Sequence, residues 1–439
     1  MNETELNWAP ELPKIGGGRR LRMQNRCAPP KYLLLKYLPI LCTAFFLYQS
    51  SGVSAQNNHD DSPINPLYVD PAAHDFSQNP PLLDRIRSGP HGYLRFINIE
   101  FSKEVCRRFR DIIPQTPMFN LHGDAHLEQY AITDLGRGLT DFDDSSTGPA
   151  FLDLMRFGVS LHLTCLANKW GQHSDTLFDE FLSGYRSALQ DPKIEAPEPK
   201  VVKRIRSKFR YNRESYFEWV DSIIDPIPPE EQAELSDALK PYIRTMIAEK
   251  PNLTQEFFNV RNMGYLRLGI GSALDLKYLV RLRGDTDEPL DDVVLEIKEV
   301  RNISGIDCIG KTHQSDPFRV LLGQARIAYQ PFKLLGYLRM RGRAFWIHSW
   351  VDNYKEVDIH ETFKSVDELR EVVYDVGLQL GKGHPKQIAA PLDLQLRREQ
   401  LRLLIKYEQV LKETRKELAQ LAISAWEGFC LQVNKDEGK

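Results

Sequence analysis

The sequence shows no marked excess of either charge, because 57 lysines and arginines stand against 60 aspartates and glutamates, for a formal net charge of −3. A chain so close to neutral gives no support for nucleic-acid binding, which usually requires a strongly basic surface. Apolar residues make up 42% and charged residues 27% of its 439 residues. These values are typical of a globular protein and exclude a disordered chain and a collagen-like fibre. Internal repeats and low-complexity tracts are absent as well.

A long hydrophobic run is also missing. The uncharged run at 37–48 is 12 residues long, whereas a bilayer span needs about 20. Residues 1–55 hold seven basic residues and three acidic ones and end in small residues at 53–55. This pattern predicts a secretory signal peptide cleaved after Ala55, and therefore a protein exported to the periplasm or secreted, with no stable membrane span after cleavage. An uncleaved N-terminal membrane anchor is the alternative.

Cysteines are few, and none of them forms a C-x-x-C pair. Zinc-finger and thioredoxin-type sites are therefore excluded. Four cysteines follow the predicted leader, so an exported chain could form up to two disulfides. The sequence does not assign their pairing, and buried free thiols are an equal alternative. The four are Cys106, Cys165, Cys308 and Cys430.

The pattern of apolar residues divides the remaining chain into four parts. Residues 56–82 are rich in Asn, Asp, Ser and Pro and are predicted to form a linker. Residues 83–260 have mostly helical spacing, residues 264–351 alternate as strands do, and residues 352–439 are mostly helical again. The predicted fold class is α+β, with a helical lobe, a β-rich lobe and a C-terminal helical segment.

Individual elements follow from the same spacing. We expect one helix at 83–113, two at 150–190, a mostly helical stretch at 201–260 and a helix at about 317–330. Strands are expected at 118–121, on either side of a glycine turn at 269–272, at 293–298, near 335–340 and at 344–351.

The densest group of polar residues lies in two short motifs. The sequence His-Gly-Asp-Ala-His at 122–126 directly follows an apolar strand, and Asp-Phe-Asp-Asp follows at 141–144. Two such turns at strand ends can face each other across a hairpin and bring Asp124 close to Asp141. Two carboxylates that close need a cation between them or a shifted pKa. Mg²⁺ fits, because it is held by one or two carboxylates together with substrate phosphates.

A plainer interpretation of these motifs stays open. Asp, Asn and Gly are common in turns, so residues 141–146 could form a polar loop without function. Asp153 could be a buried structural acceptor. His122 alone is better explained as a structural hydrogen-bonding histidine than as a ligand.

A second group of residues combines a glycine turn with a lysine. Gly269, Gly271 and Ser272 lie between two predicted strands, and Lys298 lies on the next one. A glycine turn lets backbone N–H groups approach phosphate oxygens, and a lysine one strand along can reach the same phosphates. Glycines in a hairpin are, however, more often turn residues only. A lysine in an apolar strand needs an anionic partner, for which Glu296 or Glu299 is available.

Together these motifs resemble those of a known group of proteins. They are similar to the catalytic and metal-binding motifs of aminoglycoside phosphotransferases and related protein-kinase-like enzymes. More closely, they resemble the bacterial domain-of-unknown-function family 2252, from about Asp84 to His384. The matching segments are 122–130, 140–144, 148–156, 269–272, 295–299 and 377–384.

The resemblance implies a two-lobed, protein-kinase-like fold in circularly permuted order, because the glycine turn and the lysine follow the catalytic motif. It implies Mg²⁺-dependent transfer of a phosphoryl group from ATP to a hydroxyl of a small molecule or a protein. The implied catalytic residues are Asp124, His122 and His126; the implied metal-binding residues are Asp141, Gln129 and Asp143; and the implied nucleotide-binding residues are Gly269, Gly271, Ser272 and Lys298, with a hinge beside the adenine at 348–352.

Two other functions remain open. A metal-dependent hydrolase would use His122, Asp124 and His126 as ligands and a metal-bound water as nucleophile. A non-catalytic binding protein is favoured by Gln129, which stands where the family pattern has asparagine. It is also favoured by the lack of a glutamate in the 317–330 helix to pair with Lys298, where Gln324 is the nearest candidate. The sequence names no substrate.

Overall fold

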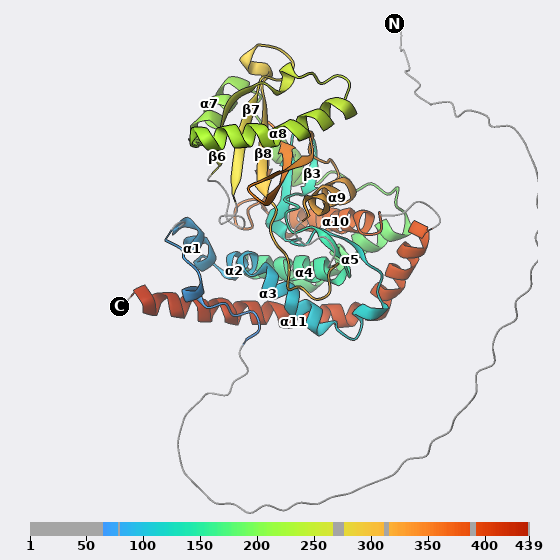
Figure 1. The fold of residues 1–439 in the computed structure, drawn as a ribbon. Coiled ribbons are helices and arrows are strands. Elements are labelled where there is room, and N and C mark those ends of the chain that lie inside the picture. The colour runs from blue at the N-terminus through green and yellow to red at the C-terminus, as the bar shows by residue number, and fades with distance from the viewer. Residues whose placement is uncertain (1–64, 78–79, 267–275, 311–315, 387–391, 438–439) are drawn as a thin grey trace, which may run out of the picture. The chain divides into compact units, whose positions relative to one another are not determined.

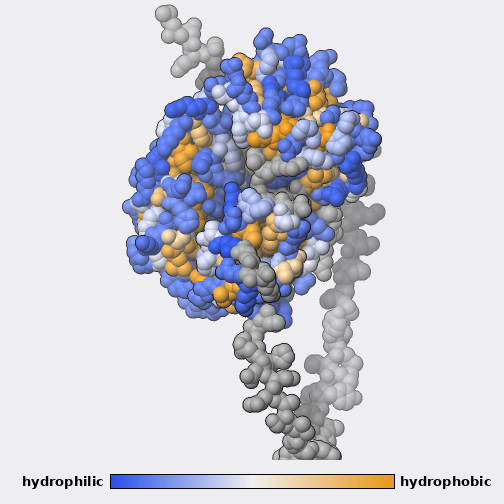
Figure 2. Space-filling view, turned by 90° about the vertical axis from the view of Figure 1, so that its left-hand side faces the viewer, coloured by the Kyte–Doolittle hydropathy of each residue, from blue (hydrophilic) through white to orange (hydrophobic). Residues whose placement is uncertain are grey.

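The computed structural model describes residues 65–77, 80–266, 276–310, 316–386 and 392–437, and every structural statement below concerns these residues. Helices dominate the lower half of Figure 1, and an antiparallel sheet with two covering helices forms the upper half. Hydrophilic residues cover most of the face drawn in Figure 2, and the hydrophobic residues visible there form smaller patches between them. Among the described residues, no helix combines the length and the apolar character that crossing a membrane requires.

The helical part has one large apolar core. Helix α5 packs along α10, and glycines allow their backbones to approach closely: a Cβ at Gly377 would lie 2.2 Å from the carbonyl oxygen of Phe181. The long α11 runs beneath α2, α4 and α5. The helices of this part are α1 (Pro80–Arg87), α2 (Pro90–Phe96), α3 (Asn98–Arg108), α4 (Phe151–Ala167), α5 (Ser174–Gln190), α6 (Lys200–Arg206), α9 (Pro317–Ile327), α10 (Val366–Gly383) and α11 (Leu392–Glu437).

The sheet part is built on six antiparallel strands in the order β5-β6-β7-β8-β10-β9. Helix α8 (Pro229–Glu249) covers one face, where its Leu235 and Leu239 share a core with Ile297. Helix α7 (Arg213–Ile223) packs against the other face through Phe217 and Val220. The strands are β5 (Ile224–Pro226), β6 (Val260–Leu266), β7 (Lys277–Leu282), β8 (Val293–Glu299), β9 (Gly336–Met340) and β10 (Arg343–Ser349).

Two small sheets lie beside the helices and carry the polar motifs. Strand β1 (Phe119–Leu121) pairs with β4 (Ser146–Gly148), and β2 (Tyr130–Thr133) pairs with both β3 (Arg137–Leu139) and β11 (Tyr354–Glu356). The motif at 122–126 directly follows β1, and the motif at 141–144 lies between β3 and β4. The hairpin of β2 and β3 therefore separates the two motifs in sequence and returns the chain to the same place.

Most expected elements are present, and the differences have physical causes. The pair of helices at 150–190 and the strands at 118–121 and 293–298 are confirmed. The single helix expected at 83–113 is three helices instead, because Pro90 begins α2 after a glycine and a further bend separates α2 from α3 at Ile97. The turn at 269–272 lies outside the described residues.

The division of the chain also differs from the expectation. Residues 201–260 were predicted within the helical lobe, but α7 and α8 belong to the sheet part and cover its two faces. Helical spacing shows that one side of a helix is apolar and does not show which core that side meets. The C-terminal segment is likewise not separate, since α10 and α11 complete the core of the helical part.

A disulfide joins Cys106 on α3 to Cys308, in the segment that follows β8. Cys165 is a buried free thiol, and Cys430 is a partly buried one. Of the two disulfides that the four cysteines allowed, the structure therefore forms one. Ile303, Ile306 and Ile309 of the segment after β8 are buried in the helical core, so the disulfide reinforces a contact that apolar packing also makes.

Candidate functional site

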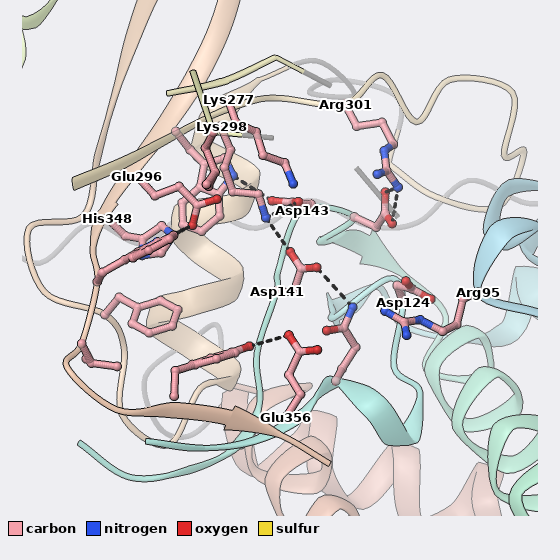
Figure 3. A pocket seen from close by; sticks show the side chains of 18 of the residues that line it. Arg95, Asp124, Asp141, Asp143, Lys277, Glu296, Lys298, Arg301, His348 and Glu356 are labelled. Carbon is pink, nitrogen blue, oxygen red and sulfur yellow. Dashed lines mark hydrogen bonds and ion pairs between the residues drawn. The ribbon is translucent and has the colours of Figure 1, made fainter. Parts of the chain in front are cut away.

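A cavity of about 380 Å³ lies between the sheet face of β7, β8 and β10 and the two polar motifs. Figure 3 shows its labelled side chains converging from both sides. Charged residues line much of the cavity, and aromatic residues gather on the side of Glu296 and His348. The charged lining residues are Arg85, Arg95, Asp124, Asp141, Asp143, Asp144, Lys277, Glu296, Lys298, Arg301, Asp352 and Glu356; the aromatic ones include Tyr216, Trp219, Phe332, Trp346, His348 and Trp350.

Lys298 lies between two carboxylates of the second motif. Its Nζ is 2.8 Å from Oδ1 of Asp141 and 2.6 Å from Oδ2 of Asp143. The other oxygen of Asp141 accepts a hydrogen bond from Gln129 at 3.4 Å, and the other oxygen of Asp143 accepts one from the Trp346 indole at 2.8 Å. An ammonium group therefore occupies the place that a cation between two close carboxylates would take.

The two carboxylates have opposite pKa shifts. Burial alone would raise the pKa of Asp141, but the charge of Lys298 and a hydrogen bond with Asp143 outweigh it and hold that pKa well below its usual value. Burial and the neighbouring negative charge of Asp141 raise the pKa of Asp143 to about 7. Two carboxylates this close share the charge of one ammonium, and their mutual repulsion is why the two pKa values move apart.

The backbone at Asp141 has an unusual conformation. Its φ is +57°, in the left-handed region that Asp tolerates better than most residues. The turn is fixed on its N-terminal side, where the Thr140 N–H donates to the Gln129 carbonyl at 2.9 Å. Residues held in this region cluster at ligand sites in proteins. In this turn the carboxylate of Asp141 points toward Lys298 (Figure 3).

The first motif presents Asp124 to the same cavity. The Arg156 Nε donates to Oδ1 of Asp124 at 2.8 Å, whereas Oδ2 lies 3.6 Å from the His126 Nε2. Burial raises the pKa of Asp124, and the guanidinium of Arg156 opposes that rise. Burial also lowers the pKa of His126 well below its usual value, so this ring is neutral near pH 7.

His122 and Asp153 support this motif rather than line the cavity. The Nε2 of His122 lies 2.8 Å from the Thr140 carbonyl, and its Nδ1 accepts from the Asp124 N–H at 3.3 Å. Asp153 accepts from the backbone N–H groups of His122 and Gly123 at 2.7 and 2.9 Å. His122 therefore joins the two motifs, and Asp153 is the buried structural acceptor that the sequence allowed.

Sheet register explains how a lysine comes to face the cavity. Lys298 on β8 is directly opposite Lys277 on β7 and Trp346 on β10. Alternate residues point to opposite faces of a strand, so Ile297 enters the α8 core while its neighbour Lys298 faces the cavity. Two lysines directly opposite each other repel. Burial and the charge of Lys298 lower the pKa of Lys277, while nearby carboxylates oppose this.

The aromatic end of the cavity is a stacked wall. The ring of His348 lies between Phe332 and Trp346, with ring centroids 4.5 Å away on each side. Trp219 and Trp350 stack on each other at 5.7 Å. Such a wall offers flat apolar faces to a planar ring system. The segment 348–352, expected beside an adenine, therefore does line the cavity.

The donor set of the second motif suits Mg²⁺. Asp141 and Asp143 supply hard oxygen atoms, and Mg²⁺ in nucleotide sites is bound by one or two carboxylates together with phosphate oxygens. The H-x-D-x-H array is different. Both ring nitrogens of His122 already contact the backbone, so this side chain offers no lone pair to a metal ion. Within the described residues, no three His, Cys, Asp or Glu side chains are grouped to hold a metal ion at either motif, so at the second motif phosphate oxygens would have to complete the coordination.

The structure brings together most of the residues that the sequence singled out. Asp124, His126, Gln129, Asp141, Asp143 and Lys298 line one cavity. Gly269, Gly271 and Ser272 lie outside the described residues. Sequence reasoning missed Lys277, Trp346 and the arginines of the cavity. Strand alternation could have indicated Lys277, but the arginines come from helices and loops whose placement depends on the fold.

Comparison with known proteins places the chain in a family. Residues 80–215 and 208–430 match the model of a family described as an uncharacterized protein conserved in bacteria, DUF2252. The chain belongs to this family. No curated protein and no solved structure matches it. The DUF2252 match includes every charged residue that lines the cavity, from Arg85 to Glu356.

Proposed function

We propose that this protein is an Mg²⁺-dependent phosphotransferase with a protein-kinase-like cleft in permuted sequence order. It takes the γ-phosphoryl group of ATP and transfers it to a hydroxyl of a small molecule or a protein. One observation carries the proposal: Lys298 of the sheet reaches 2.8 and 2.6 Å from the carboxylates of Asp141 and Asp143, in a cavity that Asp124 also lines. Phosphoryl transfer relies on positioning and on neutralising charge, which a lysine, carboxylate-bound Mg²⁺ and a base provide.

The two ends of the cavity suit the two ends of a nucleotide. The base would lie against the aromatic side of the cavity, where Trp219 and Trp350 are part of the lining, and the phosphates would extend toward Lys277 and Lys298. Asp141 and Asp143 would hold Mg²⁺, which supplies positive charge to the phosphate oxygens. In the nucleotide complex, Lys298 would exchange its carboxylate partners for phosphate oxygens.

The reaction step follows from the position of Asp124. The oxygen of the acceptor hydroxyl attacks the γ-phosphorus and forms a new oxygen–phosphorus bond. The bond from the γ-phosphorus to the bridging oxygen breaks, and its electron pair leaves on ADP. The hydroxyl proton passes to Oδ2 of Asp124, because Arg156 holds the other oxygen. Burial raises the pKa of Asp124, which favours its accepting a proton.

A calorimetric titration with ATP and Mg²⁺ tests the nucleotide site. In Asp141→Asn and Lys298→Met, we expect Mg²⁺-dependent affinity for ATP to fall tenfold or more, about 1.4 kcal/mol. The matched controls are Asp287→Asn and Lys355→Met, which change the same residue types on the exposed surface and should bind as the parent does. Absence of Mg²⁺-dependent ATP binding in the parent would show that the proposal is wrong.

Asp124→Asn tests transfer separately from binding. We expect this variant to bind the Mg²⁺ complex of ATP like the parent and to form ADP at least about 100-fold more slowly, because the proton acceptor is lost while the amide oxygen can still accept from Arg156. Release of ADP is measured by phosphorus NMR. If the parent binds the nucleotide but forms no ADP, the protein binds nucleotides without transfer, the function that Gln129 favoured. Equal rates of ADP formation in the parent and Asp124→Asn would show that Asp124 is not the proton acceptor.

A further inference from the structure

A carboxylate lies on the nucleoside side of the cavity, within its aromatic wall. Glu296 is two residues before Lys298 on β8 and therefore faces the same side of the sheet. In the sheet, Glu296 is paired with Leu279 on β7 and with His348 on β10. Figure 3 shows Glu296 and His348 close together on the side of the cavity away from Asp124.

Two hydrogen bonds fix this carboxylate through one of its oxygens. The His348 Nε2 lies 3.1 Å and the Trp350 Nε1 lies 2.7 Å from Oε2 of Glu296. No hydrogen bond to Oε1 is formed among the described residues. The side chain is 12% exposed and lines the cavity. An acceptor is thus held rigidly, and its second oxygen remains available to a ligand.

The spacing along β8 indicates which part of a nucleotide this oxygen meets. Two residues of a strand rise about 7 Å, so Glu296 lies roughly that far from Lys298 toward the aromatic end. If Lys298 contacts the phosphates, this places the carboxylate beside the nucleoside. An ionised carboxylate can only accept hydrogen bonds and repels phosphates, so it selects a group that donates.

We infer that Glu296 determines the nucleoside specificity of the site, by accepting a hydrogen bond from a donor group of the nucleoside through Oε1. This inference rests on the proposed function. The donor is a ribose hydroxyl or an exocyclic amino group of the base. Both donate hydrogen bonds, and nucleotide analogues that lack one or the other distinguish them. The ordinary alternative is that Glu296 only balances the charge of the two lysines.

The experiment compares ATP with inorganic tripolyphosphate, which carries the phosphates without a nucleoside. Both are titrated with Mg²⁺ into the parent, Glu296→Gln, Glu296→Leu and the control Glu299→Gln, which lies on the same strand and faces away from the cavity. We expect Glu296→Leu to lose about tenfold or more in affinity for ATP and nothing for tripolyphosphate, because a hydrogen bond to a charged group is lost only with the nucleoside. Glu296→Gln keeps the shape of the side chain, and we expect a smaller loss in the same direction.

Analogues then identify the donor. The parent is expected to discriminate against either 2′- and 3′-deoxy-ATP or inosine triphosphate, and Glu296→Leu is expected to lose that discrimination. Equal effects of Glu296→Leu on ATP and tripolyphosphate, or unchanged discrimination, would overturn the inference and leave the proposed function standing. If the parent bound neither ATP nor tripolyphosphate, both the inference about Glu296 and the proposed function would be wrong.

Discussion

Asp153 is a single carboxylate on which the geometry of the first motif depends. It is fully buried and accepts from two backbone N–H groups of that motif and from the His384 Nε2 at 3.0 Å. Burial would raise the pKa of Asp153, but the hydrogen bond and charge of His384 outweigh it and lower that pKa. Its role is therefore to hold the turn that carries Asp124.

We expect Asp153→Asn to reduce the free energy of unfolding by about 3 kcal/mol, because an amide N–H₂ would then face donors in a buried site. Asp141→Asn is the comparison. It should change stability by less than about 1 kcal/mol, because Lys298 keeps Asp143 as its partner. Chemical denaturation of both variants measures the difference. Equal stability losses would show that Asp153 has no special structural role.

His162 gives a residue-scale prediction about pH. Its Nδ1 lies 2.9 Å from the Ser174 hydroxyl and 3.4 Å from Arg415, so the ring must accept at that nitrogen. Burial and the charge of Arg415 lower its pKa to about 4, Lys416 acts in the same direction, and Asp175 opposes them. A histidine with a lowered pKa stabilises the folded state above its unfolded pKa of about 6.5.

That stabilisation is lost as the pH falls from about 6.5 toward 4, because the unfolded chain then binds the proton more readily. Between about pH 6.5 and 4, the free energy of unfolding of His162→Gln should fall by about 2 kcal/mol less than that of the parent. This figure allows for the partial exposure of the ring. Urea denaturation at several pH values measures it. His360→Gln, at an exposed position, is the control and should follow the parent curve. Parallel curves for parent and His162→Gln would contradict the assignment.

At the scale of single residues, the sequence predicted which residues belong to the site more easily than which residues they contact. The sequence indicated the second motif and Lys298, because carboxylates in turns and a lysine in an apolar strand are unusual. It proposed Glu296 or Glu299 as partner for that lysine, but the hydrogen bonds of Lys298 go to Asp141 and Asp143 instead. The partners of Lys298 are determined by how the sheet packs against the motif, and local sequence patterns do not show this packing.

At the scale of elements, the disulfide connects α3 to the segment that leads from β8 to α9. The same segment carries Arg301, whose Nη1 lies 3.1 Å from Asp144 at the cavity. Helix α3 carries Asn98, which donates to the same carboxylate at 3.0 Å. The covalent link therefore joins two elements that both contact Asp144.

We expect the double variant Cys106→Ala/Cys308→Ala to lose about 4 kcal/mol of unfolding free energy, since the bond joins residues 202 positions apart and restricts the unfolded chain. Cys165→Ala removes a buried thiol without breaking a cross-link and is the matched control. Reducing agent should lower the stability of the parent and leave that of the double variant unchanged. If reduction affects both equally, the disulfide does not form.

Element types were predictable from spacing, whereas their packing partners were not. The apolar stripes of α8 and α5 are similar in sequence, yet α8 covers the sheet and α5 belongs to the helical core. The choice depends on contacts with strands that follow α8 in sequence. Breaks were predictable where proline caused them, as at the start of α2.

At the scale of the whole molecule, α11 joins the N-terminal segment to the helical core. Its Phe429 is fully buried and lies against the rings of Phe76, Tyr93 and Phe96. The side chain of Asn65 donates to the Leu421 carbonyl of the same helix at 2.9 Å. The two ends of the described chain are therefore held together by one helix.

Phe429→Ala should reduce the free energy of unfolding by about 3 to 4 kcal/mol, because it leaves a cavity among these rings. Leu431→Ala, two residues later on the same helix, removes a 63% exposed side chain and should change stability by less than about 0.5 kcal/mol. Thermal and denaturant unfolding of both variants test this. Similar losses at the two positions would show that the end of α11 is not packed as described.

The order of the parts along the chain has a consequence for how the cavity forms. Asp141 and Lys298 are 157 residues apart, so their contact belongs to the high-contact-order part of the fold. Local contacts such as those of α4 with α5 form first, and pairings between distant segments follow after the cost of closing long loops. If the proposed function is right, nucleotide affinity should accordingly be among the last native properties to appear on refolding. A ligand that binds only the completed cavity would then stabilise the folded state by mass action, at the last step of folding.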